Sequence, residues 1–165
     1  MRPPTSAGGS TSGPIGSIAL VRTTTDDPRF RGLGAELDAD MARRFSDTSL
    51  QLMPHDPVDG LPTAVIALAG DRAIGCGCLR PIEPTTVELK RMFVLAELRG
   101  RGIAARLVSA LEDWARELGY ARVAVEAYVL QRDVIALYRR LGYESIPAFG
   151  VYVGMATSVC LGRAL

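Results

Sequence analysis

One stretch of the sequence, residues 87–118, constrains the fold more than any other. Residues 87–94 are rich in the types that favour strands, and a glycine-containing turn separates them from apolar residues at helical spacing. This pattern predicts a strand, a tight turn and the start of a long helix. The first N–H groups of a helix have no intrahelical partner, and the helix dipole adds partial positive charge there. We therefore expect the turn to bind an anion, and a phosphate or pyrophosphate suits it best.

The turn is made of residues that suit such a site. Gly100 and Gly102 have no Cβ, so a ligand can approach the backbone closely, and Arg99 and Arg101 add full positive charges. Exposed arginines need no ligand, but beside a glycine-rich helix start we expect these two to contact phosphate. The spacing is not that of a P-loop, because no Gly-Lys-Ser/Thr follows. Nor is it the dinucleotide fingerprint, because Ala105 stands where a third glycine is required.

The remainder of the chain predicts an α/β domain with a mixed sheet. Residues 1–17 are rich in Gly, Ser, Thr and Pro and have no apolar signal-peptide core, so we expect a disordered tail outside a domain that spans 18–165. Pro81 and Pro84 are expected to break the chain before the central strand. The expected strands are residues 18–21, 64–69, 73–80, 87–94, 121–128, 143–146 and 159–161, and the expected helices are residues 28–44, 103–118 and 131–141.

The central strand and the helix after it carry two further predictions. The apolar residues of the strand change phase between Leu89 and Met92, which predicts a β-bulge near Lys90 and Arg91. A bulge releases backbone groups from the neighbouring strand and so suits a ligand site. The helix is expected to bury a stripe of apolar side chains, namely Ile103, Leu107, Leu111, Trp114 and Leu118.

Composition places the chain among globular proteins and limits its partners. The 165 residues are 48% hydrophobic and 22% charged, and no apolar run approaches the ~20 residues of a membrane span. Because the formal net charge is +1 with interspersed signs, we expect neither nucleic-acid nor membrane binding. Cys76, Cys78 and Cys160 are expected to be buried reduced thiols of a cytoplasmic protein, without a bound metal. His55, in an expected loop at 45–62, is expected to be solvated.

Three segments carry a recognisable pattern when they are taken together. They are residues 88–94 (Glu-Leu-Lys-Arg-Met-Phe-Val), Arg99-x-x-Gly102-x-Ala104, and residues 135–143 (Ile-Ala-Leu-Tyr-Arg-Arg-Leu-Gly-Tyr). In this order they resemble the conserved segments of the GNAT superfamily of N-acetyltransferases. The resemblance extends from about residue 18 to the C-terminus. It implies a mixed central sheet whose two parallel strands splay apart, flanked by helices, with acetyl-CoA as co-substrate in the gap.

The resemblance also implies which residues hold the co-substrate. The backbone of the central strand would pair with the pantetheine arm, and amides at the helix start would hold the pyrophosphate. Gln131 stands where many members have Asn, so its carboxamide is a further candidate contact with a longer reach. The implied cofactor-binding residues are Met92, Phe93, Val94, Arg99, Gly100, Arg101, Gly102, Ile103, Ala104, Ala105 and Gln131.

Acetyl transfer from a thioester to an amine needs a base for the amine, a polarised carbonyl and an acid for the leaving thiolate. The resemblance implies Tyr138 as the acid, although its place on an apolar helix face also suits a core tyrosine. It implies Glu88 as the base, with Glu126 on the adjacent strand or an ordered water as alternatives. A backbone amide near Phe93 or Val94 is expected to polarise the carbonyl.

These inferences lead to one function and one alternative. The first is an N-acetyltransferase that moves an acetyl group from acetyl-CoA to a primary amine of a small molecule, protein or peptide by direct attack in a ternary complex. The alternative is a GNAT-fold protein that binds acyl-CoA as a sensor or scaffold without turnover. The sequence does not name the acceptor. Its pocket is expected from residues 45–62 and 147–154, where Phe149 and Tyr152 could face it or merely pack, and a homodimer is left open.

Overall fold

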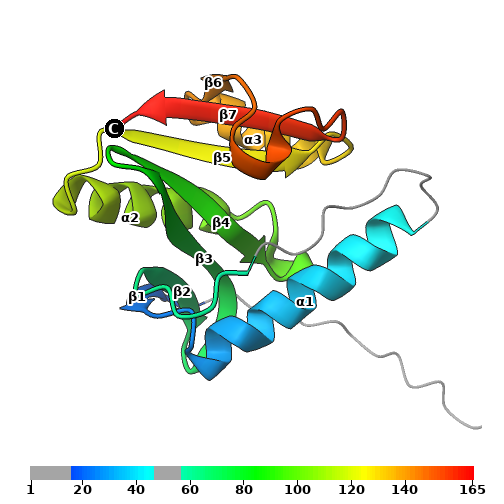
Figure 1. The fold of residues 1–165 in the computed structure, drawn as a ribbon. Helices are drawn as coiled ribbons and strands as arrows, with labels where there is room; N and C mark the ends of the chain where they lie inside the picture. The colour runs from blue at the N-terminus through cyan, green and yellow to red at the C-terminus, as the bar shows by residue number, and fades with distance from the viewer. Residues whose placement is uncertain (1–15, 47–56) are drawn as a thin grey trace, which may run out of the picture.

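The structure is a computed structural model that describes residues 16–46 and 57–165 (Figure 1). All the predicted strands and helices are present, several with shifted ends. All but the last two residues of the predicted tail, 1–17, lie outside the described residues, and so does His55. The elements are β1 (Ile18–Thr23), α1 (Pro28–Phe45), β2 (Ala64–Ala69), β3 (Arg72–Glu83), β4 (Thr86–Val94), α2 (Ile103–Glu117), β5 (Arg122–Tyr128), α3 (Arg132–Arg140), β6 (Glu144–Ser145) and β7 (Ser158–Ala164), with 3₁₀ turns η1 (Ala96–Leu98) and η2 (Gly150–Tyr152).

One seven-stranded sheet forms the centre of the domain, in the order β1-β2-β3-β4-β5-β7-β6. Every neighbouring pair is antiparallel except β4 and β5, which run parallel. Their pairing joins only residues 86–89 of β4 to residues 122–125 of β5, so the C-terminal parts of these two strands separate. The predicted α/β class, with a mixed sheet and splayed parallel strands, is confirmed.

Helices cover both faces of this sheet (Figure 1). On one face, α1 packs over β2, β3 and β4 and buries Phe30 and Leu33 in a cluster with Ile66. On the other face, α2 buries Leu107 and Leu111 in the main core, which Tyr138 of α3 also joins. Side chains alternate along a strand. Neighbouring residues of β4 therefore face opposite helices, and the two faces carry different chemistry.

Two expectations about element ends were wrong. β3 does not break at Pro81 but runs on to Glu83. The N–H of Leu79 donates to the carbonyl of Thr63, the residue just before β2. Backbone nitrogens two residues apart on a strand face the same side, so the Pro81 nitrogen also faces that side, where β2 has not yet begun and no ladder hydrogen bond is lost. Leu118 is 51% exposed instead of buried, because it caps the end of α2, where the helix no longer lies over the sheet.

The predicted bulge in β4 is confirmed. Cys76 pairs with Phe93 and Cys78 pairs with Lys90, so β4 has one more residue than β3 over this interval. Within the bulge Arg91 takes φ +56°, the one positive φ of a non-glycine residue in the described part of the chain. The bulge lies just beyond the last pair of β4 with β5, at the point where the two strands separate.

β3 makes room for the bulge and supports it from behind. A Cβ on Gly77 would collide with Sδ of Met92 and press on Cδ1 of Leu111, so glycine at this position leaves the Met92 side chain where it lies. The thiols of Cys76 and Cys78 donate to backbone carbonyls of the bulge at 3.4 and 3.5 Å. Burial raises the pKa of both thiols to about 12, and Cys160 is buried and free as well. The expectation of three buried thiols is confirmed.

Candidate active site

A cleft of about 460 Å³ opens where β4 and β5 separate. It is bounded by the end of β4, the turn before α2, the first part of α2, α3 and the last turns of α1. The predicted acid Tyr138 lies in its wall, whereas the predicted base Glu88 and the predicted cofactor residue Arg101 do not. The predicted cofactor residues that line it are Met92, Phe93, Val94, Arg99, Gly100, Gly102, Ile103, Ala104, Ala105 and Gln131.

The start of α2 has an open geometry that suits an anion. Gly102 is the N-cap at φ +77°, and Gly100 has φ +75°. In the described part of the chain, no atom beyond the flanking residues lies within 4 Å of the place where a Cβ would stand on either glycine, and no side chain caps the helix. The amides of the first helical residues therefore lack both an intrahelical acceptor and a capping oxygen. A diphosphate group fits such a cradle of N–H donors.

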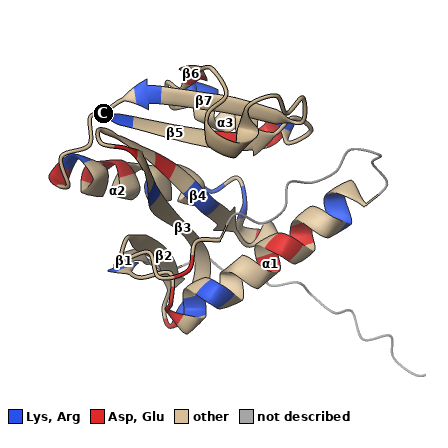
Figure 2. Ribbon diagram, viewed as in Figure 1, with Lys and Arg blue, Asp and Glu red and all other residues tan. Residues whose placement is uncertain are grey.

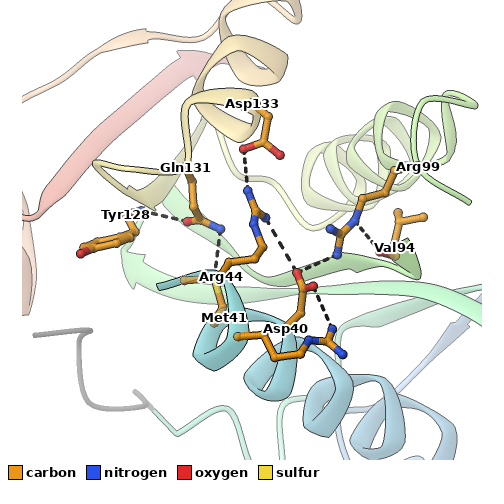
Figure 3. Close-up of polar contacts among 9 residues, drawn as sticks. Asp40, Met41, Arg44, Val94, Arg99, Tyr128, Gln131 and Asp133 are labelled. Atoms are coloured by element: carbon orange, nitrogen blue, oxygen red, sulfur yellow. Dashed lines mark hydrogen bonds and ion pairs between the residues drawn. The ribbon is translucent and has the colours of Figure 1, made fainter. Parts of the chain in front are cut away.

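The two arginines of the turn differ in their surroundings. Arg99 is already engaged, since its Nε donates to the carbonyl of Val94 at 3.1 Å and its Nη2 donates to Asp40 of α1 at 2.8 Å (Figure 3). Arg101 is exposed and has no ion pair within the described residues. The sequence therefore placed both arginines correctly beside the turn, but only Arg99 reaches the cleft.

Gln131 uses its carboxamide to hold neighbouring segments together. Its Oε1 accepts the N–H of Tyr128 at 3.0 Å, and its Nε2 lies 3.2 Å from Sδ of Met41 on α1 (Figure 3). Gln131 thus ties the end of β5 to α1 while it lines the cleft. Beyond Leu89 the β5 side of β4 has no strand partner, which leaves a strand edge able to pair with an extended ligand.

Tyr138 belongs to both the core and the cleft. Its side chain is 2% exposed, and its ring meets that of Tyr143 edge to face, with centroids 5.1 Å apart. Burial, and to a lesser extent the charge of Glu112, raises the pKa of the Tyr138 phenol well above its ordinary value. The phenol is therefore protonated at neutral pH, as a proton donor must be. Its position shows the core packing that the sequence allowed and places it in the wall of the cleft, while its role as the acid stays a prediction.

The opposite face of the sheet carries a polar cluster, which we call the α1-face cluster: Arg80, Glu88, Lys90, Glu126 and Tyr152. Glu88 is fully buried at its centre. One of its oxygens, Oε2, accepts from Nη2 and Nε of Arg80 at 2.6 and 3.1 Å. The other, Oε1, accepts the Tyr152 hydroxyl at 2.9 Å, and that hydroxyl accepts from Lys90 Nζ at 2.7 Å. Both oxygens of the predicted base are thus already occupied.

Glu126 is the less constrained carboxylate of the cluster. It is half-buried on β5, one residue beyond the last pair of β5 with β4, where β5 still pairs with β7. No cation in the described part of the chain forms an ion pair with it. Burial raises the pKa of Glu126, while the Ser158 hydroxyl and the charge of Lys90 partly offset that effect. A carboxylate whose pKa is raised and which forms no ion pair with a described residue suits a role in proton transfer.

Residues 30–143 match the Acetyltransferase (GNAT) family. The chain belongs to the GNAT family of acetyltransferases. The superfamily predicted from the sequence is thereby confirmed, and membership supports acyltransferase activity in general. Within the described residues of this GNAT protein, no helix is long and apolar enough to cross a membrane, and no three His, Cys, Asp or Glu side chains gather as metal ligands would.

Relatives and solved structures agree with the assignment to GNAT. An uncharacterised N-acetyltransferase of Escherichia coli K12, YjgM, is 36% identical over 134 residues, which cover 75% of this chain and 80% of that protein. The chain spans only 28–58% of the length of six further curated relatives. A structure described as an acyl-CoA N-acyltransferase of Klebsiella pneumoniae is similar with TM-score 0.75 and 28% identity, over 90% of this chain and 97% of that one. A GNAT structure from Elizabethkingia anophelis with acetyl-CoA bound shares the fold, with TM-score 0.65 and 16% identity over 90% and 98% of the two chains.

The sequence missed two kinds of residue in this GNAT protein. Asp40 and Arg44 of α1 line the cleft, but nothing in the helical periodicity of α1 indicated a site. Arg80 was not singled out either, because its partner Glu88 is recognised only when β3 and β4 pair. Tyr152, which could have faced an acceptor, is instead buried against Phe149 and hydrogen-bonded inside the cluster.

Proposed function

We propose that this protein is an acetyl-CoA-dependent N-acetyltransferase that acts on a primary amine. Bound acetyl-CoA supplies an activated acetyl thioester. The observation that carries the proposal is the cleft itself, which combines an open N–H cradle, an unpaired strand edge and a protonated tyrosine in one cavity at the parting of β4 and β5. The three buried, free thiols support the further expectation of a reducing cytoplasmic location.

The backbone holds the co-substrate in this proposal. The uncapped amides at the start of α2 bind the diphosphate, since they are preorganised donors at the positive end of the helix dipole. The free edge of β4 around Phe93 and Val94 aligns the extended pantetheine arm, and an amide there polarises the thioester carbonyl. Apolar lining from Leu107 and Val108 excludes water from the inner end of the cleft.

Side chains from the two faces move the protons. Tyr138, protonated and in the cleft wall, donates its proton to the departing thiolate. For the base, the surroundings favour Glu126 over Glu88, because Glu88 is fully buried with both oxygens occupied and Glu126 is neither. Glu126 takes the proton of the attacking amine, directly or through a water.

A screen of amines tests the function. Thiol release from acetyl-CoA is followed with DTNB against small amines, amino acids and lysine-containing or N-terminally free peptides, and CoA binding is measured by calorimetry. We expect CoA binding together with thiol release that depends on one class of amine and is lost in Tyr138→Phe. Tight CoA binding without release on any amine would contradict turnover and favour a sensor or scaffold.

A further inference from the structure

The last turns of α1 form a wall of the cleft that no motif indicates. Figure 2 shows acidic residues in the middle of this helix and basic residues at its end. Leu37, Asp40 and Arg44 all line the cleft, although α1 packs on the opposite face of the sheet from α2 and α3. The helix reaches the cleft because the separation of β4 and β5 leaves its C-terminal half without sheet beneath it.

Asp40 is a buried carboxylate in the wall of a site made for an anion. It is 6% exposed, and three arginines surround it. Arg99 Nη2 lies 2.8 Å from its Oδ2, Arg43 Nη2 lies 3.1 Å from its Oδ1, and Arg44 Nη1 lies 3.8 Å from Oδ2. Burial alone raises the pKa of Asp40, but the hydrogen bonds and charges of these arginines outweigh it and hold that pKa below its ordinary value. The group is therefore an anion at neutral pH.

A second ion pair connects the same turn of α1 to the other side of the cleft. Arg44 Nη2 contacts Asp133 Oδ1 on α3 at 3.0 Å, and the ring of Phe45 meets that of Tyr128 edge to face at 5.0 Å. Figure 3 shows Asp40 between Arg44, which comes from the same helix, and Arg99, which comes from the turn before α2. The end of α1 therefore bridges the two halves of the split sheet, and Asp40 is the member of this bridge that contacts the cradle.

Arg99 is fixed by this arrangement in two directions. Its Nε donates to Val94 at the end of β4 while its Nη2 donates to Asp40, and its guanidinium stacks 5.5 Å from the centre of the Phe93 ring. A planar guanidinium with two such contacts has little rotamer freedom left. An isolated carboxylate here would repel the phosphates of a ligand. A carboxylate that pairs with arginines instead fixes the positions of their positively charged guanidinium groups.

We propose that Asp40 is a positioning residue for co-substrate binding, which acts by holding Arg99 beside the phosphate cradle before the ligand arrives. The inference rests on the proposed function, because the ligand it concerns is CoA. It assigns a role in the CoA site to α1, a helix outside the sequence motif. Asp40 contacts Arg99 and not the ligand, so its effect must pass through Arg99.

Calorimetry with CoA tests the proposal on the full-length protein. Asp40→Asn keeps the shape and one hydrogen-bond acceptor but removes the charge, and we expect CoA to bind about 10-fold more weakly, as for one lost charge-assisted contact. Asp38→Asn is the matched control, since Asp38 is an exposed aspartate of the same helix that pairs with Arg91 and does not line the cleft. Its CoA affinity should equal that of the wild type.

A double variant separates positioning from a merely structural role. If Asp40 acts through Arg99, adding Asp40→Asn to Arg99→Gln causes no further loss of CoA affinity. A further 10-fold loss in the double variant would mean that Asp40 only anchors α1, and would overturn the proposal. Should Asp40→Asn fail to fold by circular dichroism, Arg99→Lys replaces it, because lysine keeps the charge but cannot contact Val94 and Asp40 together. Arg99→Lys should then show the 10-fold loss, and wild-type affinity would overturn the proposal.

The remaining outcomes distinguish the two proposals. Unchanged or tighter CoA binding by a folded Asp40→Asn variant overturns the positioning role alone, and tighter binding would identify Asp40 as a competitor of the phosphates. Wild-type protein that does not bind CoA overturns the proposed function, and the role of Asp40 falls with it.

Discussion

The two faces of the split sheet carry different kinds of polar site, one built from backbone N–H groups and the other from paired side chains. On the α2 side, the cradle is built from consecutive backbone groups at the start of one helix, and no side chain among the described residues caps these donors. On the α1 side, the cluster is built from side chains of β3, β4, β5 and η2, and its charges already satisfy one another. The comparison indicates that the first face is prepared for a ligand from outside, whereas the second is largely closed on itself.

The contrast also predicts how each face responds to mutation. Changes in the cradle should alter ligand affinity with little effect on stability, because few protein contacts depend on it. Changes in the cluster should alter stability or pH dependence, because each group there supports another. Glu126 is the exception within the cluster, because it forms no ion pair with a described residue. We propose that it takes the proton of the amine, while Tyr138 on the other face protonates the thiolate.

The largest expected effect comes from placing a carboxylate in the cradle. Gly102→Glu directs a negative charge and a side chain into the open space where a phosphate is proposed to bind. CoA affinity should fall roughly 100-fold or more by charge repulsion and displacement. The positive φ of Gly102 should cost about 1 kcal/mol of stability.

Gly119→Glu is the matched control for this change. Gly119 also has a positive φ and open space around it, but it stands at the far end of α2. We expect a similar stability loss by thermal unfolding with unchanged CoA affinity by calorimetry. Equal CoA affinity in folded Gly102→Glu and wild type would remove the cradle from the binding site.

The next effect tests whether Tyr138 belongs to the chemistry or only to the core. Tyr138→Phe keeps the ring packing and deletes the hydroxyl, so the single-turnover rate should fall about 10- to 100-fold while CoA affinity stays near wild type. Tyr143→Phe is the comparison, because its hydroxyl donates to Glu112 at 2.7 Å inside the core. That variant should lose about 1–2 kcal/mol of stability and keep its rate. A wild-type single-turnover rate in Tyr138→Phe would end the acid assignment.

How much the sequence could predict follows from the same contrast between the faces. The bulge depends on the change of phase between Leu89 and Met92, and the cradle on the spacing of Arg99 and Gly102. Both are therefore predictable from the order of neighbouring residues alone. The Glu88–Tyr152 and Asp40–Arg99 contacts join residues 64 and 59 positions apart. A single sequence contains no signal for which charged residues meet over such separations, since that depends on strand pairing and on where α1 ends. The sequence therefore favoured Glu88 as the base but left Glu126 or an ordered water as alternatives.

The pH dependence of kcat/KM distinguishes Glu126 from Glu88 as the base. A carboxyl base must be deprotonated, so wild-type kcat/KM should rise with pH through the raised pKa of Glu126. Glu126→Gln should remove this limb, lower kcat/KM about 10-fold at neutral pH, and recover partly at alkaline pH, where the amine is already free. Glu88→Gln should keep the wild-type profile shape. If Glu88→Gln instead loses the rise of kcat/KM with pH and Glu126→Gln keeps it, the base is Glu88.

Stability changes in these variants should run in opposite directions. Because the folded-state pKa of Glu126 is raised, the native protein binds more protons than the unfolded chain just above the ordinary pKa, and stability falls as pH rises through this window. Glu126→Gln removes that cost, so its melting temperature at neutral pH should be no lower than that of the wild type. Glu88→Gln removes the carboxylate charge that Arg80, one-fifth exposed, contacts at 2.6 Å, and should cost about 2 kcal/mol, less than a fully buried pair would, because solvent reaches Arg80. Equal melting temperatures for the two variants would contradict this contrast.

The smallest expected effect concerns the rim of the cleft opposite the cradle. Arg140 at the end of α3 lines the cleft and has no ion pair within the described residues, whereas its neighbour Arg139 is exposed but does not line it. Arg140 is thus a cation in the cleft wall that forms no ion pair with a described residue. Because the group is exposed and screened by solvent, Arg140→Gln should weaken CoA binding only about 3-fold at low salt, and added salt should reduce the difference. Arg139→Gln should bind CoA as the wild type does, and the same titrations with dephospho-CoA show whether Arg140 responds to the 3′-phosphate or to the diphosphate. Equal effects of the two substitutions would mean that only the general charge of α3 matters, and the rim would then add no specific contact to the cradle.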